Sequence, residues 1–213
     1  MGKGKLLVID GLDGTGKTTQ HELLKQSGVL GEALFVKFHT RGTDTGNVVT
    51  KYLDGKLPAN PYAAAMFYAM DRYVSGQTDK WLRHYESGGV VIAERYVTSN
   101  AVYQSARLPK TERFNFIEWL YDLEYGKLSL PKPDRVFFLT MPEEVSKRLV
   151  DSRGEARDIH ESDAPYRSEC GATARYIAGL DGWETIDCVK SGALRNVDDI
   201  QLELVTKIKD FLD

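Results

Sequence analysis

One glycine-rich segment near the start of the chain constrains its fold more than any other feature. Residues 11–18 read Gly-Leu-Asp-Gly-Thr-Gly-Lys-Thr and fit the pattern G-x-x-x-x-G-K-[ST] at every position. An apolar run at residues 5–10 precedes the segment, and a helical pattern begins at Lys17. In such a strand–loop–helix unit the glycines let backbone N–H groups close around an anion at the positive end of the helix. The segment therefore predicts a loop that binds the phosphates of a nucleotide.

Individual residues of this loop have separate predicted roles. Lys17 reaches the terminal phosphates, and the hydroxyl of Thr18 is suited to binding Mg²⁺. The predicted ATP-binding residues of the loop are Gly11, Gly14, Thr15, Gly16, Lys17, Thr18 and Thr19. The alternative is a glycine-rich turn without a ligand, which the full match of spacing and flanking elements disfavours. A phosphate loop by itself does not distinguish a switch, a motor and a kinase.

Short apolar runs recur along the rest of the chain and alternate with helical patterns. The runs lie at 34–38, 90–93, 136–139 and 184–188. Because they are apolar without alternation, they suit strands that are buried on both faces of a parallel sheet. Helical spacing or helix start signals cover residues 17–27, 46–55, 61–86, 111–125, 142–152 and 197–212. We therefore predict a three-layer α/β fold, with helices flanking a five-stranded parallel sheet and ligands at the carboxyl ends of its strands.

Length and hydrophobic content predict a single domain. The chain has 213 residues, of which 42% are hydrophobic, enough for one sizeable core and too few for two. Segment 153–172 differs from the rest, because it is rich in charged and small residues and has almost no apolar pattern. We expect residues 1–213 to form one domain and segment 153–172 to be a mobile lid on it.

The overall charge bounds the possible partners. The formal net charge is −3, so no bulk positive field draws the chain to nucleic acid, and functional cations must be local. Apolar runs such as 135–140 are too short to span a membrane, and the start of the chain leads directly into a strand, without room for a signal peptide. Cys170 and Cys188 match no metal-ligand spacing and are expected to be reduced thiols. We expect a cytoplasmic protein that has neither nucleic acid nor a membrane as a partner.

Five motifs, in the same order and spacing, resemble those of thymidylate kinases. They are D-G-L-D-G-T-G-K-T-T at 10–19, F-H-T-R at 38–41, M-F-Y-A-M-D-R at 66–72, E-R-Y-V-T-S-N-A-V-Y at 94–103 and L-P-K-P-D at 130–134. The resemblance covers residue 5 to about residue 175. It implies a P-loop kinase fold and transfer of the γ-phosphoryl group of ATP to dTMP, which gives dTDP and ADP. It also implies Mg²⁺ as the cofactor and a homodimer packed through helices.

Two arginines at the ends of predicted strands suit an acceptor that already bears a phosphate. Arg41 lies just past the second strand and Arg95 just past the third, at the same edge of the sheet as the phosphate loop. Transfer between phosphates must neutralise crowded anions, and a guanidinium fork matches phosphate oxygens better than an ammonium does. Each alone could be an ordinary surface arginine, and the family positions favour phosphate binding for both.

Two acidic residues lie beside the predicted phosphates. A carboxylate at Asp13 is electrostatically awkward unless it serves the acceptor or the metal; the alternative is a residue that only forms the turn. The resemblance implies that Asp13 hydrogen-bonds the 3′-hydroxyl of the acceptor and acts with Lys17 and Arg95 in catalysis. Glu94 closes the third strand, where P-loop proteins commonly hold Mg²⁺ through an acidic residue. The family usually has Asp there, and deoxynucleoside kinases have Glu-Arg-Ser, whereas Tyr96 takes the third place here.

The helical segment 61–86 supplies candidates for a base pocket. Tyr68 and Arg72 are four residues apart and share a helix face, where a ring can stack on a base and a guanidinium can donate to its exocyclic oxygen. The resemblance implies these two roles. Phe67 is the neighbouring candidate, but its partner four residues on is Asp71. The alternative is an aromatic core position with an arginine in solvent.

Further candidates follow the third strand. The amide of Asn100 can satisfy the N3–H of a pyrimidine together with a neighbouring carbonyl. Tyr103 shares its helix face, and by resemblance it crowds the 2′ position against ribose. Ser99 fits either substrate binding or capping of a helix that starts there, and Asn100 favours binding over capping. Gln104 is expected to add a contact.

The transferring phosphoryl group is expected to meet arginines of the lid. Some relatives carry a catalytic arginine in the phosphate loop, where this chain has Gly14 and Thr15. We expect Arg153 and Arg157 to contact the transferring phosphate instead, and Arg148 to lie nearer the adenine. Closure of the lid would also exclude water, which competes for the phosphoryl group. The alternative is a solvated, charged loop.

Other functions stay open from the sequence. A non-catalytic P-loop switch would need a signature such as N-K-x-D, which the sequence lacks. A kinase for another nucleoside monophosphate, or for a deoxynucleoside, keeps the enzyme class and changes the acceptor. Arg41 and Arg95 together favour an acceptor with a phosphate.

Overall fold

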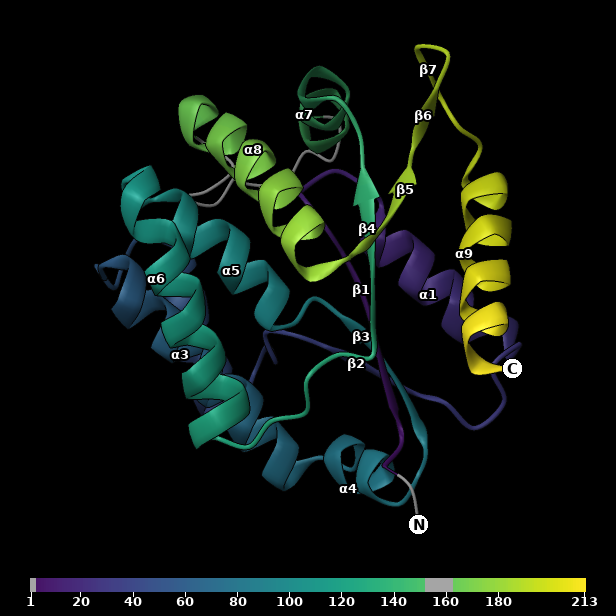
Figure 1. Cartoon of the computed structure of the whole chain (residues 1–213), viewed down its shortest axis with the longest axis horizontal. Helices are drawn as coiled ribbons and strands as arrows, with labels where there is room; N and C mark the ends of the chain where they lie inside the picture. The colour runs from purple at the N-terminus through teal and green to yellow at the C-terminus, as the bar shows by residue number, and fades with distance from the viewer. Residues whose placement is uncertain (1–2, 152–162) are drawn as a thin grey trace.

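The central sheet has five parallel strands in the order β2-β3-β1-β4-β5 (Figure 1). The computed structural model describes residues 3–151 and 163–213. The strands are β1 Lys5–Gly11, β2 Leu34–Lys37, β3 Val90–Glu94, β4 Arg135–Thr140 and β5 Glu184–Asp187. β1, β3 and β4 are almost wholly buried, as expected for apolar runs with helices on both sides. The predicted α/β fold with a five-stranded parallel sheet is confirmed.

Helices cover both faces of this sheet, which makes three layers. They are α1 Lys17–Ser27, α2 Asp44–Leu53, α3 Pro61–Thr78, α4 Trp81–Glu86, α5 Val97–Ala106, α6 Lys110–Tyr121, α7 Glu143–Asp151, α8 Ala164–Asp181 and α9 Val197–Leu212. Leu24 of α1 and Leu204 of α9 pack with Leu7 of β1 on one face. On the other face α3, α5, α6 and α8 pack with Leu6, because successive residues of a strand point to opposite sides. A two-stranded hairpin, β6 Val189–Lys190 and β7 Ala193–Leu194, follows β5. Within the described residues, no helix is long and apolar enough to cross a membrane.

The predicted helix 61–86 is two helices, because the chain changes direction at Asp79. The backbone of Asp79 is extended, with φ −89° and ψ 169°, and its carboxylate accepts a hydrogen bond from Ser75 Oγ at 2.6 Å. Trp81 Nε1 donates to the same hydroxyl at 3.2 Å, and the indole is only 1% exposed. Burial of this large ring accompanies the break, which helical spacing alone does not reveal.

The predicted helix 111–125 also changes character within its length. α6 ends at Tyr121, and a π-helix, η1 Asp122–Lys127, continues it. Single π-turns inside helices are often found at functional sites. Glu124 lies in this turn and is fully buried.

Part of the predicted lid segment 153–172 belongs to the core, contrary to the expectation. Asp163 caps α8 by accepting a hydrogen bond from the backbone N of Tyr166 at 3.1 Å. Tyr166, Cys170 and Ala174 are buried along one side of α8. Their spacing of four residues is a helical pattern that the surrounding polar residues conceal in the sequence. Residues 153–162 of the segment lie outside the described residues.

Candidate active site

The loop between β1 and α1 is built on glycines with left-handed backbone. Gly14 and Gly16 both have φ +85°, where other residues are strained. A Cβ atom on Gly14 would also lie 2.5 Å from the backbone oxygen of Ser146 on α7. The loop leads into the first turn of α1, whose backbone N–H groups lack intrahelical partners. It thus has the backbone that a phosphate site requires.

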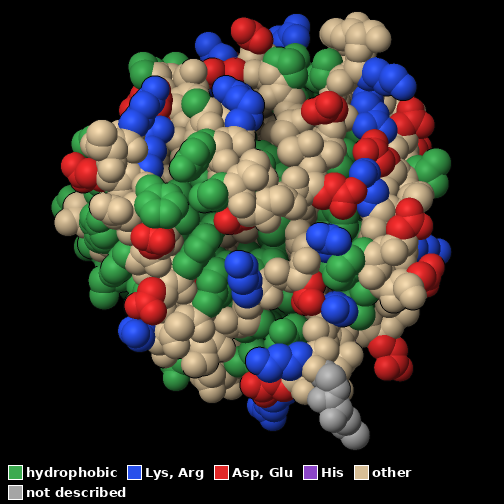
Figure 2. All heavy atoms as spheres, viewed as in Figure 1, with side chains coloured by type: hydrophobic (Ala, Val, Ile, Leu, Met, Phe, Trp, Pro, Cys, Tyr) green, Lys and Arg blue, Asp and Glu red, His purple; other side chains and the backbone are tan. Residues whose placement is uncertain are grey.

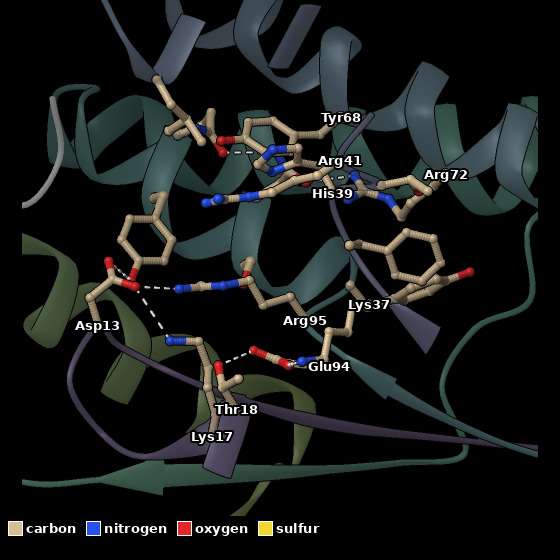
Figure 3. A pocket seen from close by; sticks show the side chains of 18 of the residues that line it. Asp13, Lys17, Thr18, Lys37, His39, Arg41, Tyr68, Arg72, Glu94 and Arg95 are labelled. Atoms are coloured by element: carbon tan, nitrogen blue, oxygen red, sulfur yellow. Dashed lines mark hydrogen bonds and ion pairs between the residues drawn. The ribbon is translucent and has the colours of Figure 1, made fainter. Parts of the chain in front are cut away.

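A cavity of about 640 Å³ lies beside this loop, with residues that follow β2 and β3 in its wall (Figure 3). Most of the predicted site residues line it: Asp13, Gly16, Lys17, Thr18, Thr19, Arg41, Tyr68, Arg72, Glu94, Arg95, Ser99, Asn100, Tyr103 and Gln104. The cationic side chains of the lining are Lys17, Lys37, Arg41, Arg72 and Arg95, whereas its acids are Asp13 and Glu94. A chain of net negative charge thus gathers cations in one cavity, which suits an anionic ligand.

Asp13 organises the end of the cavity next to the loop. Its carboxylate accepts hydrogen bonds from the guanidinium of Arg95, from Lys17 Nζ at 3.3 Å and from the hydroxyl of Tyr103 at 2.8 Å. Burial by itself would raise the pKa of Asp13, but the charges of Arg95 and Lys17 outweigh it and hold that pKa well below its usual range. Asp13 is therefore an ionised carboxylate that pairs with two cationic side chains, those of Arg95 and Lys17.

Arg95 reaches Asp13 from the residue directly after β3. Its backbone φ is +62°, a region that non-glycine residues seldom occupy and that is enriched at functional sites. Its backbone N donates to Ile9 O at 3.1 Å, which fixes this corner against β1. Figure 3 shows the guanidinium extended across the cavity toward Asp13.

The two predicted Mg²⁺ ligands, Thr18 and Glu94, are in contact. The hydroxyl of Thr18 donates to Glu94 Oε1, and Lys37 Nζ lies 3.2 Å from Glu94 Oε2 and 2.7 Å from Glu22. Burial would raise the pKa of Glu94, but the hydrogen bond from Thr18 and the charges of Lys17 and Lys37 lower it.

A hydroxyl beside an ionised carboxylate suits Mg²⁺, which prefers oxygen ligands. No group of three or more His, Cys, Asp or Glu side chains that could hold a metal ion occurs in residues 3–151 and 163–213. Thr18 and Glu94 supply two oxygen ligands, which fits Mg²⁺ that takes its other ligands from phosphate oxygens and water.

The loop after β2 carries Arg41 and His39 into the lining. Buried Asp71 of α3 accepts a hydrogen bond from the backbone N of Thr40 at 2.8 Å, which fixes this loop. Burial and the charge of Arg41 lower the pKa of His39 to about 4, so its ring is neutral at neutral pH.

Tyr68 lies across the cavity from Lys17 (Figure 3). Its ring contacts His39 edge to face, with 6.2 Å between centroids. Phe67, the neighbouring candidate, is not in the lining and instead packs edge to face against Tyr52 at 6.3 Å. Of these two neighbouring rings, that of Tyr68 lines the cavity. Phe67 is therefore removed from the candidate site.

Arg72, which follows Tyr68 by four residues on α3, is the centre of a buried hydrogen-bond network. Its Nε donates to Glu124 Oε2 at 2.7 Å, and its Nη2 donates to Glu124 Oε1. The same Nη2 donates to Asn100 Oδ1 at 2.5 Å, and Asn100 Nδ2 donates to Gln104 Oε1 at 2.8 Å. Burial would lower the pKa of Arg72, but Glu124 raises it above its ordinary value. The alternative interpretation, in which Arg72 lies in solvent, is therefore wrong.

Ser99 does not cap its helix. α5 begins two residues earlier, after Tyr96, and no side chain caps it. The hydroxyl of Ser99 donates to the buried carboxylate of Asp10 at 2.9 Å and accepts from Arg95 Nη1 at 3.0 Å. Ser99 therefore lies in the cavity wall as a support for Arg95.

A second cavity, of about 450 Å³, lies on the other side of the loop and is bounded by α7 and α8. Thr15 lines this cavity, and Gly11 and Gly14 line neither. Arg148, expected near the adenine, is exposed on α7 and lines neither. Arg153 and Arg157 lie outside the described residues.

The structure adds residues that sequence reasoning missed. Lys37 and His39 line the cavity. The sequence feature that could have predicted them is their position as polar residues at the carboxyl end of a short apolar run. Glu124 holds Arg72; its signal was an acidic residue four positions after Leu120, on the apolar face of a helix. Charges seldom occupy such positions unless they are paired.

A phosphate loop after the first strand of a parallel sheet, with converging cations in a cavity at its edge, defines the class of P-loop kinases. Comparison with known proteins agrees. The family model described as thymidylate kinase matches residues 9–179. A thymidylate kinase of Mycobacterium tuberculosis is 33% identical over 192 residues, which cover 84% of this chain and 87% of that protein. A probable thymidylate kinase of Methanosarcina acetivorans is 27% identical over 99% of this chain and 98% of its own length.

The chain belongs to the thymidylate kinase family. A solved thymidylate kinase of Candida albicans has the same fold, with a TM-score of 0.77 over 98% of this chain and 92% of the other at 23% identity.

Proposed function

We propose that this chain transfers the γ-phosphoryl group of ATP to dTMP and releases dTDP and ADP. The observation that carries the proposal is the joint cavity, in which the phosphate loop and the acceptor-side cations Arg41 and Arg95 face one space. Membership of the family supports dTMP as the acceptor.

The two anions are brought together by cations that are already in place. Lys17 binds the terminal phosphates of ATP, and Arg95 and Arg41 bind the phosphate of the acceptor, which lowers the repulsion between donor and acceptor. Asp13 keeps Arg95 and Lys17 at the junction and is free to accept a hydrogen bond from the 3′-hydroxyl. Mg²⁺, held through Thr18 and Glu94 when bound, neutralises charge on the phosphate oxygens.

The other end of the cavity selects the base: Tyr68 stacks on the pyrimidine ring, and Arg72, Asn100 and Gln104 contact its edge. Tyr103, whose hydroxyl donates to Asp13 near the loop, excludes a 2′-hydroxyl on the sugar. We further propose that Arg153 or Arg157 contacts the transferring phosphoryl group and that Arg148 contacts the adenine. If so, Ala or Lys at 153 or 157 lowers kcat and leaves the KM of dTMP unchanged.

An acceptor screen tests the proposal. Purified protein with ATP and Mg²⁺ is given dTMP, dUMP, dCMP, dGMP or thymidine, and ADP formation is followed. We expect turnover with dTMP above all others. Preferred use of thymidine would indicate a deoxynucleoside kinase, and ATP consumption without any acceptor would indicate another class of P-loop protein.

The chain is also proposed to form a homodimer through α3. Met66, Met70 and Tyr73 lie at helical spacing on this helix and are 54%, 51% and 36% exposed. Such a stripe suits burial against a second copy. Met70→Glu should then convert a dimer to a monomer in light scattering. For location we infer the cytoplasm, because Cys170 and Cys188 are free thiols.

A further inference from the structure

The carboxylate of Glu124 is unusual in its place. It is 0% exposed, it lies in the π-helical turn η1, and both of its oxygens are taken by Arg72. Arg72 itself is 1% exposed. Replacing a buried ion pair by apolar side chains is often neutral or stabilising, so stability alone gives little reason for such a pair. A role toward the adjacent cavity gives a better one.

The pair sets the direction of a chain of hydrogen bonds. An ionised carboxylate only accepts, so Glu124 fixes the Nε and Nη2 edge of Arg72 as the edge that faces the protein. Nη2 also donates to Asn100 Oδ1, which forces the Asn100 amide to turn its Nδ2 toward Gln104 Oε1. The amide group of Gln104 likewise turns its Oε1 toward Asn100, which leaves its Nε2 on the other side. Each carbonyl oxygen of this chain thus already accepts one bond from its neighbour.

The groups that the network leaves over are N–H donors. Within residues 3–151 and 163–213, Arg72 Nη1 and Gln104 Nε2 donate no hydrogen bond, and both side chains line the cavity. Asn100 Nδ2 keeps a second hydrogen. These donors complement the carbonyl oxygens of a base edge and oppose an exocyclic amino group, because two donors facing each other leave both unsatisfied. The second lone pair of Asn100 Oδ1 can accept the N3–H of a 4-keto pyrimidine, which a 4-amino pyrimidine lacks.

We infer that Glu124 is a positioning residue for base specificity: through Arg72 it orients Asn100 and Gln104 so that the cavity accepts 4-keto pyrimidines, such as thymine and uracil, and rejects 4-amino pyrimidines, such as cytosine. This inference rests on the proposed function, since it concerns the acceptor base of the same site.

Glu124→Gln tests it, because the side chain keeps its size and loses its charge. We expect the ratio of kcat/KM for dTMP over dCMP to fall by roughly 10- to 100-fold, the range for a hydrogen bond to a charged partner. The KM of ATP should stay within about twofold, since the phosphate loop is untouched. Glu118→Gln, on the exposed side of α6, is the matched control and should change neither quantity.

A purely structural role for Glu124 gives a different result. The melting temperature then falls, and the dTMP to dCMP ratio stays at the wild-type value, which overturns the inference. If Glu124→Gln does not fold, Glu124→Asp takes its place. Its shorter carboxylate weakens the fork, and a ratio that does not fall by at least about threefold, the low end for one hydrogen bond, is equally contrary. A wild-type protein that does not phosphorylate dTMP would instead refute the proposed function.

Discussion

The two ends of the cavity are both built from ion pairs, but they differ in exposure. At the base end the side chains of Arg72 and Glu124 are 2% and 0% exposed. At the phosphate end those of Arg95 and Asp13 are 23% and 22% exposed. A fully buried pair cannot exchange its partner without leaving a charge unpaired, whereas a part-exposed pair can.

This difference matches what each end has to do. In the proposed function the base end holds one pattern of donors, and its cation is fixed by the carboxylate of Glu124, which is not in the cavity lining. The phosphate end of the proposed function needs Lys17 and Arg95 to contact incoming phosphate oxygens, and Asp13 holds both of them at the cavity wall. Figure 2 shows hydrophobic side chains gathered on the face of the molecule that α8 covers, where Tyr176 and Leu180 are exposed.

Lys17→Ala should have the largest effect, because it removes the cation that compensates the terminal phosphates. We expect kcat to fall by ~10²–10³ or more, the range for losing one group aimed at transition-state charge. Steady-state ADP formation measures this, and thermal unfolding checks that the fold is intact. Lys25→Ala, on the exposed side of the same helix, is the control. Near-native activity of Lys17→Ala would refute the assignment of the loop.

Arg95→Ala tests whether the phosphate end divides into donor and acceptor sides. Losing a charge partner in a closed site costs about 2–5 kcal/mol, and we expect that loss in kcat/KM for dTMP rather than in ATP affinity. Varying each substrate at saturation of the other separates the two. Arg83→Ala, exposed on α4, provides the comparison. Unchanged dTMP kinetics would remove Arg95 from the acceptor side.

Tyr68→Leu and Phe67→Leu form a matched pair at the base end. Stacking of a base on an aromatic ring contributes about 1–3 kcal/mol, so Tyr68→Leu should raise the KM of dTMP by roughly 5- to 150-fold. Phe67→Leu should lower the melting temperature, because its contact with Tyr52 is lost, and leave that KM unchanged. The reverse pattern would show that the other ring faces the base.

His39→Asn should have the smallest effect and reports on the positive field in the cavity. The pKa of His39 is lowered from 6.5 to about 4, first by burial and then by Arg41. A neutral ring is thus favoured in the folded state, and its contribution to stability is present above pH 6.5 and is lost as the pH falls toward 4. After discounting for the partial exposure of His39, we expect the free energy of unfolding of the wild type to fall by about 1 kcal/mol more than that of the variant between pH 7 and pH 5. The melting temperature of the wild type should fall further from pH 7 to pH 5 than that of the variant. Equal falls in the two proteins would show that the positive charges of the cavity do not act on His39.

The sequence predicted the site better where a role depends on local pattern. The phosphate loop, the strands and the i, i+4 pair of Tyr68 and Arg72 follow from neighbours in the chain. The sequence analysis missed the end of α3 before Asp79, which depends on the burial of Trp81. It also missed the start of α8 within segment 163–172, which depends on the burial of Tyr166. Arg153 and Arg157 stay predictions.

What the sequence by itself determined is the chemistry that this chain can offer: a phosphate loop, arginines at strand ends and an aromatic with an arginine on one helix face. What only the tertiary structure decided is how these groups are held. Arg72 and its carboxylate partner are 52 residues apart, and Arg95 and Asp13 are 82 apart. Such pairs carry no periodic signal in the chain, because their distance is set by how the helices and strands pack. The packing therefore decides which donors are left to face the ligand.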